Sequence, residues 1–267
     1  MAQQIALMIH QKSHMHDDVR IDSASFLCHY TSHLLIHEHD SYSKLLDMKA
    51  TVITSKDVNG KIQYPMSYQD VYGKLFGGDR IHDHHHIDNY EGDNTEAHDL
   101  TTDTGVDDDR KDSPRFEATR LPSTVILECP HREIGGKNTT FGDLQLISNL
   151  CRDNGIALHM DGARIWEAAV YYNNDDNYAC HGINEEIAAD HVVGDIRVEP
   201  TEEETMHETI LRVASLFDSI YVSTYKGLGA MTGSLLVGSR EFIQEARIWL
   251  RRFGGIHILQ QYYTAVE

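Results

Sequence analysis

The sequence predicts an α/β protein, a three-layer sandwich in which helices cover both faces of a mostly parallel sheet. Three observations carry this prediction. From Thr124 onward, short apolar runs alternate with amphipathic segments, which is typical of parallel strands joined by helices. Hydrophobic residues make up 40% of the 267 residues, enough for a sizeable core. No apolar run reaches the roughly 20 residues of a membrane-spanning helix, and we expect a cytoplasmic protein.

The elements expected in the first part of the chain are few. Residues 2–12 place apolar side chains among good helix formers and predict a helix. Residues 25–35 are rich in Phe, Leu, Cys and His and favour a strand or loop, whereas the β-branched run at 50–55 predicts a short strand.

The pattern becomes clearer in the second part. The run TVILE at 124–128 predicts a buried strand, and residues 144–154 predict an amphipathic helix that ends at Gly155. Further strands are expected at 156–160, 219–224 and 234–237, followed by a helix at 240–252.

The net charge of −19 is concentrated in two stretches. Residues 76–115 contain 12 acidic and 4 basic residues, and residues 172–209 contain 11 and 1, which together give −18. We expect both to be insertions, the first of them His-rich and disordered. They divide one large domain into residues 1–75, 116–171 and 210–267. No basic stripe with interleaved aromatic residues supports nucleic-acid binding.

Functional groups in parallel sheets gather where strands end. Three predicted strands end in the polar segments Glu128–His131, Asp161–Arg164 and Tyr225–Gly229. A carboxylate and a lysine at neighbouring strand ends are what pyridoxal phosphate (PLP) requires, the first for its ring nitrogen and the second for a Schiff base. Arg164 could bind a substrate carboxylate through its planar fork.

The strings ALHMDGARIWEAAV (157–170) and FDSIYVSTYKGLGAMTGSLLVG (217–238) resemble the threonine aldolase / β-eliminating lyase family of PLP enzymes. LECPHREIGG (127–136), SHLLIHE (32–38) and MAQQIAL (1–7) agree with it. The resemblance implies a fold type I large domain and these roles: Lys226 binds PLP covalently, Asp161 pairs with the ring nitrogen, His33 stacks on the ring, Arg164 binds the substrate carboxylate, and His131 lies near its β-hydroxyl. His37 is the alternative to His33.

The implied reaction is cleavage of threonine or allo-threonine to glycine and acetaldehyde, carried out by a homodimer or homotetramer. The same residues would serve β-elimination. Tyr225 stands where the family usually has a small residue, which leaves the exact substrate open. The chain begins at or just past the expected phosphate-binding turn and ends before the expected small C-terminal domain, so an inactive truncated homologue is a further alternative.

Metal binding is a competing interpretation. His82, His84, His85 and His86 lie among aspartates and could take up Zn²⁺, but a disordered tract lacks the fixed geometry of a specific site. The spacing of His29, His33 and His37 could mimic a helical metal face. Because the surrounding residues favour a strand or loop, we prefer the cofactor role for His33 and expect no metal site.

Overall fold

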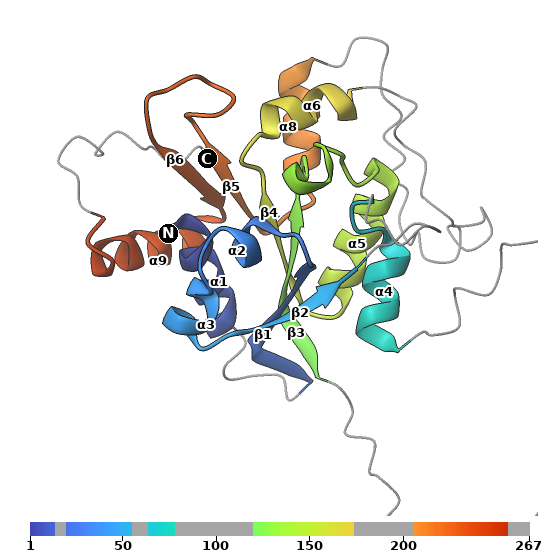
Figure 1. Cartoon of the computed structure of the whole chain (residues 1–267), viewed down its shortest axis with the longest axis vertical. Helices are drawn as coiled ribbons and strands as arrows, with labels where there is room; N and C mark the ends of the chain where they lie inside the picture. The colour runs from blue at the N-terminus through green and yellow to red at the C-terminus, as the bar shows by residue number, and fades with distance from the viewer. Residues whose placement is uncertain (14–19, 55–63, 78–119, 174–204, 256–267) are drawn as a thin grey trace, which may run out of the picture. The chain divides into compact units, whose positions relative to one another are not determined.

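The computed structural model describes residues 1–13, 20–54, 64–77, 120–173 and 205–255. A six-stranded sheet has the order β2-β1-β3-β4-β5-β6 (Figure 1). Its strands are β1 (Ile21–His29), β2 (Lys49–Ile53), β3 (Leu121–Glu128), β4 (Ala157–Asp161), β5 (Ser219–Ser223) and β6 (Ser234–Gly238). All neighbours are parallel except β5 and β6. The predicted mostly parallel sheet is confirmed.

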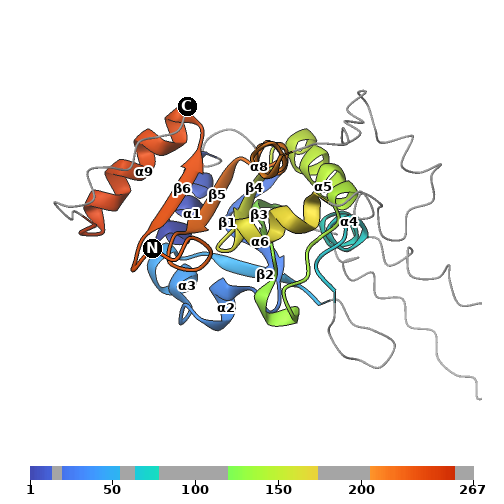
Figure 2. The same ribbon diagram turned by 90° about the horizontal axis from the view of Figure 1, so that it is seen from above.

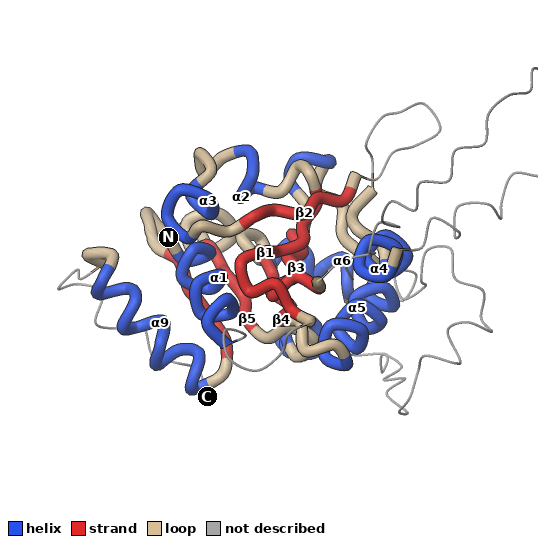
Figure 3. Tube along the Cα trace, turned by 90° about the horizontal axis from the view of Figure 1, so that it is seen from below, coloured by secondary structure: helices blue, strands red, loops and turns tan. Residues whose placement is uncertain are grey.

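Helices cover both faces of the sheet, as expected for a three-layer sandwich (Figure 2). One face carries α1 (Ala2–Ser13), α3 (Ser41–Leu46) and α9 (Arg240–Arg252). The other carries α4 (Tyr68–Phe76), α5 (Phe141–Asp153), α6 (Ile165–Tyr172) and α8 (Met206–Ala214). The short α2 (His33–Ile36) follows β1 (Figure 3).

Side chains that alternate in direction along each strand divide the hydrophobic core between these two faces of the sheet. Leu27 and Val125 belong to the cluster that includes residues of α4, α5, α6 and α8. Their neighbours Phe26 and Ile126 point the other way and pack with Leu7 of α1. Successive side chains of a strand point to opposite faces, so a fully buried strand needs apolar residues in continuous runs. The run at 124–128 was recognisable as a strand for this reason.

Helix ends depend on side-chain caps that the apolar pattern does not show. Helix α5 begins three residues before its predicted start because the Thr140 hydroxyl accepts a hydrogen bond from the Asp143 N–H at 3.1 Å. At the other end, Gly155 follows the C-cap with φ of +67°, as predicted. The bounds of α9 agree with the predicted 240–252.

Helix α4 was not predicted, although the sequence carries a signal for it. Ser67 and Asp70 form a capping box, in which each side chain accepts a hydrogen bond from the other's backbone N–H. Tyr68, Val71 and Leu75 are then buried on one side of the helix. Apolar residues at three- and four-residue spacing explain this placement.

The expectation of a strand or loop at 25–35 was right for β1 but missed α2. His29 ends β1, whereas His33 begins α2. The spacing of His29, His33 and His37 therefore does not correspond to one helical face.

Both predicted acidic insertions lie almost entirely outside the described residues, and so do His82, His84, His85 and His86. Their described ends belong to helices: Phe76 is the last residue of α4, Tyr172 is the buried last residue of α6, and Thr205 caps α8. Across the described ranges, no helix has both the length and the apolarity to cross a membrane.

Candidate functional site

Three strands end side by side at the carboxyl edge of the sheet. Glu128 of β3 is in register with Asp161 of β4, and Asp161 is in register with Tyr221 of β5. Lys226 follows β5 by three residues, in the turn that leads to β6. The parallel arrangement therefore brings together chemical groups that are distant in the sequence, as predicted from the strand ends.

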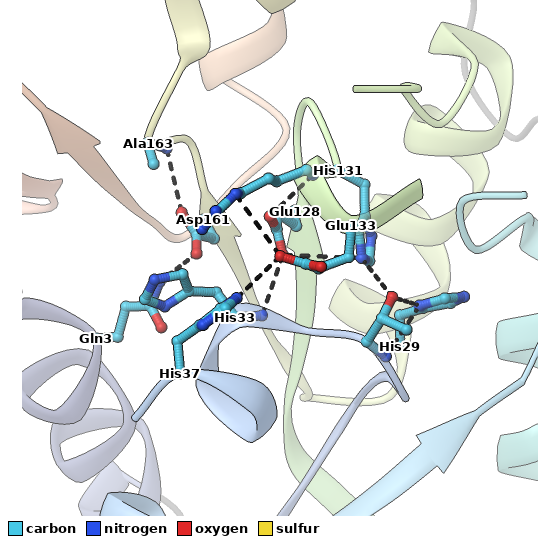
Figure 4. Close-up of polar contacts among 11 residues, drawn as sticks. Gln3, His29, His33, His37, Glu128, His131, Glu133, Asp161 and Ala163 are labelled. Atoms are coloured by element: carbon cyan, nitrogen blue, oxygen red, sulfur yellow. Dashed lines mark hydrogen bonds and ion pairs between the residues drawn. The ribbon is translucent and has the colours of Figure 1, made fainter. Parts of the chain in front are cut away.

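Asp161 is a buried carboxylate, 3% exposed. It accepts hydrogen bonds from the Gln3 side chain and, at 3.2 Å, from the Ala163 N–H (Figure 4). Burial, followed by the charge of Glu128, raises its pKa to about 6. Within the described ranges no lysine or arginine forms an ion pair with it. This carboxylate is suited to a positively charged partner, and among the described residues the charge of His33 is the one that lowers its pKa.

Glu128 is a second buried carboxylate at the site, and the sequence analysis gave it no role. It accepts hydrogen bonds from the backbone N–H groups of His33, at 3.2 Å, and Arg132, at 3.1 Å. Burial raises its pKa. The signal in the sequence was an acidic residue that ends an otherwise apolar strand.

His33 lies in the electrostatic field of both predicted cofactor residues. Its Nδ1 is 3.3 Å from Glu38 Oε1, and the hydrogen bond with Glu38 raises its pKa. The charge of Asp161 raises this pKa further, whereas the charge of Lys226 lowers it. The alternative, His37, instead pairs with Glu133 at 2.9 Å, and its side chain is 34% exposed.

His131 follows β3 and is 2% exposed. Its Nε2 atom is 2.9 Å from Thr31 Oγ1 and 3.8 Å from Glu128 Oε2. Burial lowers its pKa, so the imidazole is neutral at pH 7. A neutral imidazole at this edge of the sheet can accept a proton from a bound molecule.

Lys226 and Arg164 lie on two segments that pack against each other. Gly227 fits closely against α6, because a Cβ atom there would be 2.4 Å from Trp166 Cδ1. Arg164 is the half-buried N-cap residue of α6. Lys226 is also half-buried, with its Nζ 5.7 Å from the centre of the Tyr225 ring. In the described part of the chain, Arg164 forms no hydrogen bond or ion pair with Asp161, His33 or His131.

The chemistry of this donor set fits PLP. A buried carboxylate that forms no ion pair with a described lysine or arginine can hold a protonated ring nitrogen, and a primary amine in the turn after the neighbouring strand can bind an aldehyde. The imidazole of His33 lies within electrostatic reach of both groups.

Comparison with known proteins agrees with this arrangement. The sequence profile of the beta-eliminating lyase family matches residues 1–261. A low-specificity L-threonine aldolase of Candida albicans is 31% identical over 136 residues, which cover 49% of this chain and 27% of the relative. A solved structure of a candidate L-allo-threonine aldolase from Listeria monocytogenes is 27% identical, has a TM-score of 0.56, and is matched over 95% of this chain and 45% of its own.

A threonine aldolase structure from Leishmania major shares the fold, with a TM-score of 0.51 and 16% identity. The match covers 95% of this chain and 50% of the Leishmania chain. The chain thus spans about a quarter of the length of the curated relative and about half of the solved structures.

Proposed function

Because this chain belongs to the beta-eliminating lyase family, a family of PLP-dependent enzymes of fold type I, we propose that it is a PLP-dependent lyase that acts on a β-hydroxy amino acid. The reaction we favour is cleavage of threonine or allo-threonine to glycine and acetaldehyde. One observation carries the proposal: Asp161 ends β4, Lys226 follows the adjacent strand β5, and the charges of both residues act on the pKa of His33.

Three residues would hold the cofactor. The Lys226 amine binds its aldehyde, the Asp161 carboxylate accepts a hydrogen bond from its protonated ring nitrogen, and His33 stacks on the ring. Bound PLP would supply an electron sink for the bond that breaks. A pKa of about 6 leaves most of Asp161 ionised at pH 7, and a nearby positive charge would lower that pKa.

Two residues would act on the substrate. Arg164 binds the α-carboxylate through its guanidinium group. His131 accepts the proton of the β-hydroxyl while the Cα–Cβ bond breaks. Burial keeps His131 neutral and therefore able to accept a proton at pH 7.

The test uses the purified full chain mixed with PLP. We expect the absorbance band of a lysine–PLP Schiff base, its loss in Lys226→Ala, and its retention in Lys74→Ala, which changes an exposed lysine of α4. Absence of the band from the wild-type protein contradicts the proposal.

Products separate the two lyase reactions. Threonine should yield glycine and acetaldehyde in equal amounts. Ammonia and 2-oxobutyrate would instead indicate β-elimination of the hydroxyl group, with the same residues holding the cofactor.

We propose further, from the family resemblance, that the protein works in the cytoplasm as a homodimer or homotetramer. Light scattering on the PLP-loaded protein measures the assembly, and a monomeric mass with full activity contradicts it.

A further inference from the structure

A buried chain of two histidines and one threonine lies beside the site. His29 at the end of β1 and His131 after β3 are each 2% exposed. Between them, Thr31 Oγ1 is 2.8 Å from His29 Nδ1 and 2.9 Å from His131 Nε2. The two rings meet edge to face, with centres 4.6 Å apart (Figure 4). The proposed function uses His131 and leaves His29 and Thr31 without a role.

The backbone fixes the hydrogen-bond direction at His29. The N–H of Thr31 is 3.3 Å from His29 Nδ1, and a backbone amide can only donate. Nδ1 therefore accepts, and the hydrogen of the neutral ring is on Nε2. Because Nδ1 carries no hydrogen, the Thr31 hydroxyl must donate to it at 2.8 Å.

The direction of the hydrogen bond between Thr31 and His29 decides the direction of the hydrogen bond between Thr31 and His131. A hydroxyl group has a single hydrogen, and that of Thr31 already points to His29. Thr31 Oγ1 can therefore only accept from His131, so Nε2 of His131 carries hydrogen. The Glu128 carboxylate, 3.8 Å from the same nitrogen, favours hydrogen at that position.

Both rings are neutral at pH 7. Burial, followed by the charge of His131, lowers the pKa of His29 to about 4. Burial also lowers the pKa of His131. A neutral imidazole with hydrogen on Nε2 has an unshared electron pair on Nδ1. Both side-chain contacts of the His131 ring nitrogens in the described ranges, with Thr31 Oγ1 and with Glu128, involve Nε2, and a hydrogen bond with the Thr31 backbone raises the pKa of the ring.

We propose that His29 and Thr31 are positioning residues that hold His131 in the tautomer whose Nδ1 acts as a base. This inference rests on the proposed function, in which His131 accepts the proton of the substrate's β-hydroxyl. The O–H bond breaks, an N–H bond forms at Nδ1, and the electron pair left on oxygen forms the aldehyde C=O as Cα–Cβ breaks. A proton from solvent completes glycine, and the imidazolium returns its proton to solvent.

The opposite tautomer would carry hydrogen on Nδ1 and could only donate there. His29 and Thr31 thus decide whether His131 meets the substrate as an acceptor or as a donor. The two residues need not touch substrate or cofactor for this role, since both act through Nε2.

The tautomers can be measured without cofactor or substrate. In long-range ¹H–¹⁵N correlation spectra of the full chain labelled at its 18 histidines, the signals of His29 and His131 are assigned by their loss in His29→Asn and His131→Asn. We expect both wild-type rings to have hydrogen on Nε2 at pH 7.5. A His131 ring with hydrogen on Nδ1 overturns the inference.

Substitutions of His29 and Thr31 test whether these two residues determine the tautomer of His131. In His29→Phe, the Thr31 hydroxyl loses its acceptor and becomes free to donate to His131, so His131 should change to the Nδ1–H form. Thr31→Ser keeps the hydroxyl and should keep the wild-type tautomers, whereas Thr31→Val should give a mixed population at His131. An unchanged His131 tautomer in both His29→Phe and Thr31→Val contradicts the inference.

If a variant fails to fold, the wild-type spectrum alone still decides, because it must show both Nε2–H rings. In the PLP-loaded enzyme, Thr31→Val should lower kcat about tenfold or more with little change in KM, whereas Thr31→Ser should keep the wild-type kcat.

Wild-type protein with the expected tautomers but no PLP band would refute only the proposed function. An active lyase with Nδ1–H at His131 would refute only this inference.

Discussion

The amide of Gln3, in the first turn of α1, donates a hydrogen bond to the buried carboxylate of Asp161 at the end of β4. The two residues are 158 positions apart. The contact fastens α1 to the carboxyl edge of the sheet, and it gives Asp161 a neutral donor.

Removal of this donor should weaken both the fold and the cofactor site. Gln3→Leu leaves a buried carboxylate short of one hydrogen bond, which costs about 1–3 kcal/mol in the free energy of unfolding. The pKa of Asp161 should rise further, so PLP should bind more weakly. Urea unfolding and PLP titration measure the two effects. The control is Gln11→Leu on the same helix, where the amide makes only a 3.4 Å bond to the Leu46 carbonyl. Equal effects of the two variants would contradict the prediction.

Asp161 should destabilise the cofactor-free protein at neutral pH. Its pKa is raised from 3.8 to about 6 on folding, so the native state binds more protons than the unfolded chain between these values. Stability is therefore lost as the pH rises through this window. Asp161→Asn should raise Tm at pH 7.5 by about 2–8 °C, the shift for 1–2 kcal/mol in a domain of this size.

The same substitution should make little difference to Tm at pH 3.5, where the wild-type carboxyl is also neutral, and should weaken PLP binding at pH 7.5. Thermal unfolding by circular dichroism at both pH values checks the prediction. A lower Tm of the variant at pH 7.5 would show that the carboxylate stabilises the fold.

His159 should make the fold sensitive to acid. This side chain of β4 is fully buried, its Nδ1 is 2.7 Å from Ser219 Oγ, and burial lowers its pKa from 6.5 to about 3. The unfolded chain binds more protons between these values, so stability is lost as the pH falls below about 6.5. The loss between pH 7 and pH 5 is on the order of 2 kcal/mol.

In His159→Gln, Tm should fall less between pH 7 and pH 5 than in the wild type. His207→Gln is the matched control, since this histidine of α8 is exposed. Some acid sensitivity should remain in His159→Gln, because the pKa of His29 is also lowered. Parallel curves for all three proteins would exclude His159 as the cause.

Gly227 should be required for the position of the lysine turn. In Gly227→Ala the added methyl group would meet Trp166 Cδ1 at 2.4 Å, so either the turn or the indole must move. We expect a loss of about 1–3 kcal/mol in the free energy of unfolding, together with weaker Schiff-base formation at Lys226.

A smaller side chain at position 166 should relieve this conflict. The cost of Gly227→Ala, measured by urea unfolding, should therefore be at least about 0.5 kcal/mol smaller in a Trp166→Leu background. Strict additivity of the two substitutions would mean that the contact does not limit the turn.

Much of the fold could be predicted because strands and helices each place apolar residues in the sequence at a characteristic spacing. Residues 124–128 and 240–252 correspond to β3 and α9 for this reason. Helix α4 was missed because its apolar residues follow a stretch of mixed composition, although Ser67 and Asp70 carried a capping signal. Prediction from local pattern fails where side-chain caps decide the helix boundary.

The candidate site was partly predictable for a different reason. Asp161 ends a strand, His131 and Lys226 each follow one, and parallel strands bring such positions to one edge of a sheet. Gln3 and Thr31 gave no such signal, since each acts on a residue at least 100 positions away. Pairs at that separation become visible only when the sheet is assembled.

The sequence by itself determined which chemical groups stand at the strand ends, because apolar periodicity decides where strands begin and stop. The tertiary structure alone decided the protonation of those groups. The pKa of Asp161 depends on burial and on the charge of Glu128, and the tautomer of His131 depends on one hydroxyl hydrogen shared with His29. Burial and hydrogen-bond direction are properties of distances in space, and only the folded chain sets those distances.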